Sequence, residues 1–162
     1  MSGVILAGFD GVNNTARIIV ENTKVDCHKF ILPNEKEKSV EILLSEIKEK
    51  NAVCVVIIGQ KPNIKDKIAV EAFAKGEKGV LRTALDVTSA VELIKVQGYN
   101  AYISKGCGTS FCNHIYCNCM LSGINCIFLH VPTISCISDM NALAGAIDGF
   151  MNGLAGIPAL LH

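Results

Sequence analysis

Hydrophobic residues in this chain fall into two kinds of segment with different periods. Short apolar runs, mostly continuous and ended by Gly, Pro or Ser, are typical of strands buried on both faces of a sheet. Five such runs predict strands at residues 4–9, 25–32, 52–59, 100–104 and 125–131. The polar, glycine-punctuated stretch AKGEKG at residues 74–79 predicts a mobile loop.

Helical periodicity marks the segments between the predicted strands. One apolar face is formed by positions 40, 43, 44 and 47, and a second by positions 87, 90, 91 and 94 after a plausible Asp86 N-cap. The last helix follows a predicted Ser138 N-cap, with apolar residues at positions 140, 143, 144, 147, 150, 151 and 154. Strands that alternate with helices predict an α/β fold: a mostly parallel twisted sheet with helices on both faces, in three α/β/α layers.

Composition and charge narrow the class of protein. The 162 residues match the size of one domain, so we expect residues 1–162 to form a single α/β domain. Fifteen Lys and Arg balance fifteen Asp and Glu without clustering, which gives no electrostatic reason to expect a nucleic-acid or membrane partner. The first residues do not resemble a signal peptide, and the apolar run from Ala52 is far shorter than the ~20 residues of a membrane helix. We therefore expect a soluble cytoplasmic protein.

Eight cysteines raise the question of disulfides, a metal site or a reactive thiol. Thiols stay reduced in the cytoplasm, so this number does not imply disulfides. Three cysteines lie in strand-like runs and are interpreted as packing residues: Cys27, Cys54 and Cys126. The others in the KGCGTSFCNHIYCNC stretch, at positions 107, 112, 117 and 119, lack the paired spacing of structural zinc sites, so no metal is expected.

The carboxyl ends of parallel strands form the usual binding crevice of such a sheet. Asp66 and Cys112 follow predicted strands and His130 closes one, so the three are expected to meet at this edge. Cys112 lies near the start of a predicted helix, where free N–H groups and the helix dipole favour a thiolate with a lowered pKa. Those N–H groups, with the turn at Gly108 and Thr109, could also hold an oxyanion. His130 is the candidate base, since His114 is only two helical positions from Cys112 and points to another side.

Several of these segments resemble one known family, the pyroglutamyl (pyrrolidone-carboxylate) peptidases. GTSFCNHIY at residues 108–116 is similar to the family's nucleophile segment, and FLHVP at residues 128–132 is similar to its histidine segment. Weaker similarity lies in GFD at residues 8–10, in LP at residues 32–33, and in IGQKPNIKDKIAVEA at residues 58–72. The chain is thus identified as a shortened, divergent member of that family.

The resemblance implies a cysteine peptidase that hydrolyses an N-terminal pyroglutamyl residue from peptides through a thioester acyl-enzyme, without a cofactor. It assigns Cys112 as nucleophile, His130 as base and then acid, and Asp66 as the acid that orients His130. Phe9 matches an aromatic residue of the family's substrate pocket, and Gln60 matches the position where backbone groups bind the lactam amide.

One of these residue assignments has an alternative. The next acid after Asp66 is Glu71, which competes for the role of orienting His130.

Alternatives to the peptidase function come from other functional classes. A catalytically impaired relative could bind a small amide or peptide terminus in the same crevice, and a cysteine-rich metal or redox protein is the third possibility. The resemblance also implies a homo-oligomer, for which the apolar tail at residues 154–162 is a candidate contact, although it could equally dock on its own domain.

Overall fold

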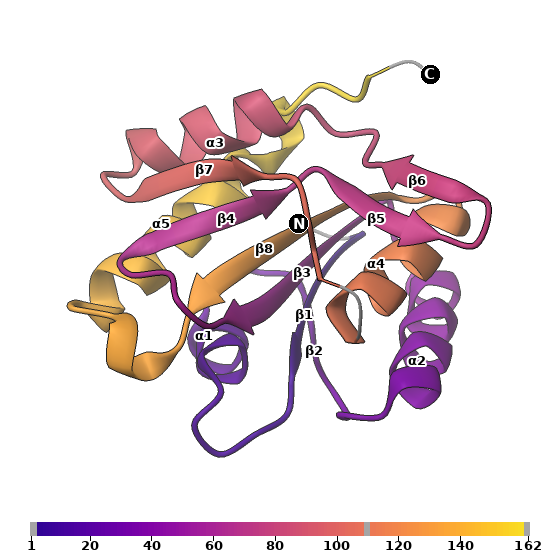
Figure 1. Ribbon diagram of the computed structural model, residues 1–162, viewed down its shortest axis with the longest axis horizontal. Helices are drawn as coiled ribbons and strands as arrows, with labels where there is room; N and C mark the ends of the chain where they lie inside the picture. The colour runs from indigo at the N-terminus through magenta and orange to yellow at the C-terminus, as the bar shows by residue number, and fades with distance from the viewer. Residues whose placement is uncertain (1–2, 109–110, 161–162) are drawn as a thin grey trace.

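The computed structural model describes residues 3–108 and 111–160, and a six-stranded sheet lies between two layers of helices (Figure 1). The strands of this sheet are Val4–Phe9 (β1), His28–Leu32 (β2), Cys54–Lys61 (β3), Lys67–Glu71 (β4), Asn100–Ser104 (β7) and Asn125–Pro132 (β8). A separate two-stranded hairpin consists of Phe73–Gly76 (β5) and Gly79–Arg82 (β6). The helices are Thr15–Asn22 (α1), Lys36–Glu49 (α2), Val87–Val96 (α3), Phe111–Leu121 (α4) and Met140–Gly153 (α5).

The strand order in the main sheet is β2-β1-β3-β8-β4-β7. Parallel pairing joins β2, β1, β3 and β8, and a second parallel pair joins β4 and β7. These two groups meet at β4 and β8, which run antiparallel. The predicted mostly parallel α/β fold is therefore confirmed, with one antiparallel junction inside the sheet.

Alternation along each strand divides the core into two halves. On one face, residues such as Leu6, Val56 and Leu129 pack against α1, α3 and α5. On the other face, residues such as Ala7 and Phe128 pack against α2, α4 and the hairpin. The odd-numbered residues at the end of β3 and the even-numbered residues at the end of β8 also point to this second face, and they carry the candidate site.

Four local features differ from the sequence prediction. Helix α1 and strand β4 were not predicted, although Asn14 caps α1 by accepting a hydrogen bond from the Ala16 N–H. Residues 74–79, predicted to be a mobile loop, instead form most of the β5–β6 hairpin. Asp139, not Ser138, is the N-cap of α5, since its side chain accepts from the Ala142 N–H. The predicted Asp86 cap of α3 is confirmed.

The β5–β6 hairpin is fixed to α4 by one side chain. Asn113 accepts a hydrogen bond from the Lys75 N–H at 2.7 Å and donates another to the Lys75 carbonyl at 3.0 Å. In this way a helix side chain takes the place of a neighbouring strand at that point of β5. Asn113 directly follows Cys112 in the chain, so the hairpin also fixes the first turn of α4.

The C-terminal segment packs on its own chain as far as the structure describes it. Leu154 and Ile157 are buried, and the Pro158 and Leu160 main chains bond to the connection that leads into α3. Residues 161–162 of the tail lie outside the described residues. Over the described ranges, no helix has both the length and the apolar character needed to cross a membrane.

Candidate active site

A buried histidine–carboxylate pair lies at the junction of β8 and β4. His130 Nδ1 donates a hydrogen bond to Glu71 Oε1 at 2.8 Å, and the Glu71 side chain is fully buried. Across the antiparallel strands, His130 pairs with Ala69, so Glu71 lies two residues further along on the same face. This contact fixes the proton of a neutral imidazole on Nδ1 and leaves Nε2 free to act as a base.

The expectation that Asp66 orients His130 is wrong. Asp66 accepts hydrogen bonds from the Ser138 main chain at 2.7 Å and from the Ser138 hydroxyl at 2.6 Å. These bonds lower the pKa of the Asp66 carboxyl, chiefly through the Ser138 hydroxyl. Asp66 therefore secures the segment before α5, and Glu71, the competing candidate, contacts the histidine.

Cys112 approaches the sheet at the level of His130. Gly59 on β3 is the register partner of His130, and a Cβ built on Gly59 would lie 3.3 Å from the Cys112 Sγ and 2.8 Å from a Phe128 ring carbon. Only a residue without a side chain leaves room for the thiol and this ring. The helix α4 thus places the thiol on the sheet face that carries the histidine–carboxylate pair.

The prediction of a lowered pKa for Cys112 is wrong. Burial, together with the charge of Glu71, raises the pKa of this thiol to about 11, and Lys61 opposes both effects. The thiol is therefore protonated at neutral pH, because desolvation outweighs the helix N-terminus. If it served as a nucleophile, a thiol in this state would need a base at the moment of attack.

Aromatic rings line the same face. Phe9 packs edge-on against Phe111 with ring centroids 4.9 Å apart and stacks at 6.5 Å from Phe128. The Phe128 ring lies 4.6 Å from the imidazole of His130. Phe9 is thus linked through Phe128 to the histidine, and Phe111, which directly precedes Cys112, is an aromatic residue that was not predicted to belong to the site.

Gln60 points its side chain to the opposite face of the sheet. Its Oε1 accepts a hydrogen bond from the Thr15 N–H at the start of α1, at 3.2 Å. The pairing of β3 with β1 ends at Ile57, so the edge of β3 that faces β1 is open at Gly59 and Gln60. Only main-chain groups of Gln60 could therefore serve a ligand on the Cys112 side.

The remaining cysteines have no disulfide partners. All eight are free, and Cys54 and Cys126 are buried as expected, whereas Cys27 is half-buried. Among residues 3–108 and 111–160, no three His, Cys, Asp or Glu side chains group so that they could hold a metal ion. Thr109, which was expected to help form an oxyanion turn, lies outside the described residues.

Solved structures of pyroglutamyl peptidases superpose on this chain. The pyrrolidone carboxyl peptidase of Fervidobacterium islandicum is similar, with a TM-score of 0.83 and 19% identity over 96% of this chain and 99% of that one. Pyroglutamyl peptidase I of Bacillus amyloliquefaciens gives 0.80 and 20% over 93% and 95%, and the Pyrococcus furiosus peptidase gives 0.82 and 16% over 94% and 98%. The chain has the pyroglutamyl peptidase fold.

No protein-family model and no curated protein sequence matches the chain. Below 25% identity, the likeness to solved pyroglutamyl peptidases establishes the fold, and chemistry has to come from the site itself. In this pyroglutamyl peptidase fold, Cys112, His130 and Glu71 occupy one face of the sheet. Glu71 could have been recognised from sequence as an acid that ends the apolar run IAVE, where a buried carboxylate requires a partner.

Proposed function

We propose that this chain is a cysteine peptidase that hydrolyses an N-terminal pyroglutamyl residue from peptides. The observation that carries the proposal is the 2.8 Å bond between His130 Nδ1 and the buried Glu71 carboxylate, on the face where α4 brings the Cys112 thiol. A thiol, an imidazole and an orienting carboxylate form the constellation of covalent acyl transfer. The likeness to solved pyroglutamyl peptidases supports the choice of substrate.

The first half of the reaction forms a thioester. His130 Nε2 takes the proton from Cys112 as Sγ attacks the pyroglutamyl carbonyl carbon, so thiolate forms during attack and is not stored beforehand. The developing oxyanion lies near the first turn of α4, where main-chain N–H groups have no helical partner. The C–N bond then breaks, and the imidazolium gives its proton to the departing amine.

The second half hydrolyses the thioester. His130 takes a proton from water as the water oxygen attacks the same carbonyl carbon, and the proton returns to Cys112 as the C–S bond breaks. Glu71 stays ionised and stabilises the imidazolium in both halves. Every proton transfer is served by residues of this chain, and the mechanism requires no cofactor.

Substrate binding is assigned to the aromatic cluster and to the open edge of β3. Phe9, with Phe111 and Phe128 behind it, offers an apolar wall for the lactam ring. Main-chain groups at Gly59 and Gln60 would bind the lactam amide, because the Gln60 side chain is already bonded to α1. The neutral ring thus replaces the charged N-terminus that an ordinary aminopeptidase recognises.

The test is release of a fluorescent amine from its pyroglutamyl amide. Wild type should turn over, and Cys112→Ala should not. A second substrate with an unblocked N-terminal proline amide serves as a matched control and should remain uncleaved. Binding of pyroglutamyl amide without amine release would reject the peptidase and leave the alternative, a catalytically impaired relative that binds an amide or peptide terminus.

A further inference from the structure

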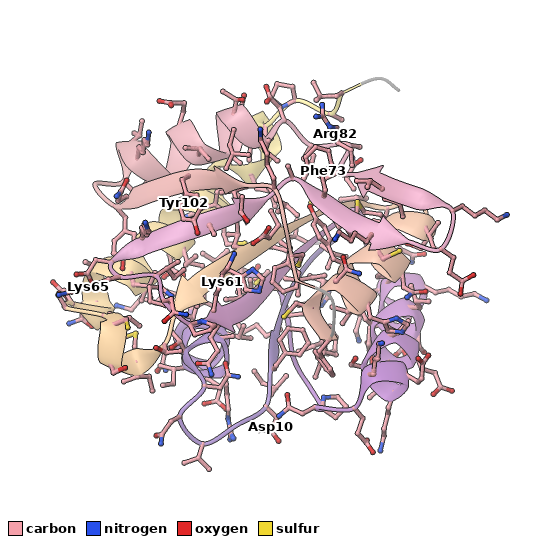
Figure 2. All side chains as sticks on the ribbon, viewed as in Figure 1. Asp10, Lys61, Lys65, Phe73, Arg82 and Tyr102 are labelled. Carbon is pink, nitrogen blue, oxygen red and sulfur yellow. The ribbon has the colours of Figure 1, made fainter. Side chains whose placement is uncertain are left out.

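A lysine side chain also contacts the buried carboxylate of the histidine pair. Lys61 Nζ lies 3.6 Å from Glu71 Oε1, the same oxygen that accepts from His130. Lys61 is the next residue after Gly59 on that face of β3, and its side chain is 31% exposed whereas that of Glu71 is fully buried. In Figure 2, Lys61 lies over the central strands and Lys65 lies at the margin of the molecule.

Glu71 needs more than a neutral imidazole to remain an anion. Removing a carboxylate from water is costly unless cations and hydrogen bonds compensate. The Oε2 atom of Glu71 is buried and has no hydrogen-bond partner among the described residues. When His130 is neutral, as a base must be, the ammonium group of Lys61 supplies a full positive charge in contact with this carboxylate.

We propose that Lys61 is a positioning residue that holds Glu71 as an anion while His130 is neutral. Without Lys61, the buried carboxylate would retain a proton within the pair, either on the imidazole or on itself, and the free base would form only at higher pH. This role rests on the proposed function in that a base at His130 is what the peptidase reaction uses, but the charge arrangement exists independently of any substrate.

Other polar groups near the pair do not supply this charge. The Tyr116 hydroxyl on α4 donates a hydrogen bond to the Glu71 main-chain carbonyl at 2.8 Å, so it supports the backbone and not the carboxylate. Burial and the charge of Glu71 raise the pKa values of the Cys107 and Cys112 thiols, and Lys61 lowers them. Both thiols are therefore neutral neighbours at physiological pH, and the ionic balance involves Lys61, Glu71 and His130.

The experiment follows the imidazole nitrogens of His130 by ¹⁵N NMR across a pH titration of the free protein. The chain has four histidines, and the spectrum of His130→Gln identifies the signals of His130. In Lys61→Met, which keeps the apolar stem, the pH at which His130 loses its proton should rise by about one unit, a tenfold change in proton affinity. Lys61→Arg should restore the wild-type titration, and Lys65→Met, a surface control, should leave it unchanged.

A titration in Lys61→Met identical to wild type would overturn the inference, as would equal shifts in Lys61→Met and Lys61→Arg. A double variant adds a second criterion: in a Glu71→Gln background the Lys61→Met shift should be clearly smaller, because the carboxylate through which Lys61 acts is gone. An undiminished shift would contradict action through Glu71. Since NMR needs no turnover, failure of amine release would reject the proposed peptidase without affecting this result.

Discussion

Glu71 contacts His130 diagonally across the antiparallel pair of strands β4 and β8. Residues two positions apart on facing strands share a face and are close enough for long side chains to meet. Asp66 precedes β4 and therefore lies beyond the carboxyl end of β8, where it bonds to Ser138. The direction of one strand thus decides which acid belongs to the histidine.

Replacement of each acid separates these roles. Glu71→Gln should lower kcat for pyroglutamyl amide by about 10³-fold or more, because the glutamine amide can donate to Nδ1 and favour the wrong tautomer. Asp66→Asn should keep kcat within about threefold of wild type, since Asp66 does not touch His130. Steady-state kinetics on both variants, with circular dichroism to verify folding, decide the matter. The opposite ranking would return the orienting role to Asp66.

Asp66 should instead affect stability in a pH-dependent way. Hydrogen bonds from Ser138 lower the pKa of Asp66 in the folded chain below its unfolded value of about 3.9. A depressed pKa means that this contribution is present above about pH 4 and is lost as pH falls through the folded value. Asp66→Asn should therefore melt below wild type at pH 7, and the two melting temperatures should converge in acid, below the folded pKa of Asp66. A gap that persists in acid would show a cause other than ionisation.

The Cys112 thiol should alkylate at a rate that depends steeply on pH. Since burial raises its pKa to about 11, the thiolate fraction should climb about tenfold per pH unit between pH 7 and 9. Peptide mapping after brief iodoacetamide treatment follows Cys112 separately from the half-buried Cys27 and Cys136. A rate at Cys112 that is already flat between pH 6 and 8 would instead indicate a preformed thiolate–imidazolium pair.

Gly59→Ala should damage both packing and chemistry. The added Cβ would meet a Phe128 ring carbon at 2.8 Å and the Cys112 Sγ at 3.3 Å, so the ring or the helix must move. Overpacking of this kind costs about 1–3 kcal/mol of the unfolding free energy, and displacement of the thiol should lower kcat. Gly145→Ala on the exposed side of α5 is the matched control, because nothing lies within 4 Å of its added methyl group. Chemical denaturation should find the control at least as stable as wild type.

Much of the fold followed from the sequence because the physical signals are local. The continuous apolar runs at β1, β3 and β8 and the amphipathic period of α5 each reflect the burial of a single element. Cys112 and His130 were proposed as site residues for a similar reason, since each lies in a short segment whose residues resemble a known motif. Turn chemistry was less reliable, because Gly and charged residues in the 74–79 stretch suit a hairpin as well as a loop.

What the sequence could not supply depends on contacts between distant segments. The antiparallel direction of β4 arises from its position between β7 and β8, and no feature of the KIAVE run specifies it. The pKa of Cys112 likewise depends on how deeply α4 presses the thiol onto Gly59, and on the charges of Glu71 and Lys61. The position of Cys112 at a helix N-terminus, taken alone, predicted a lowered pKa, whereas the pKa of this thiol is raised.

The pairing of β4 with β8 also has a consequence for how this site tolerates insertions and deletions. Glu71 is placed by a ladder in which Ala69 faces His130, and the connection before β4 takes no part in that ladder. Residues added or lost between Pro62 and Lys65 would change the length of the connection before β4 and leave the acid at the histidine. One residue added inside β4 would turn Glu71 toward the opposite layer of helices, because successive side chains alternate between faces. Insertions and deletions should therefore be tolerated in the connection before Asp66 and should disrupt the site when they fall between Asp66 and Glu71.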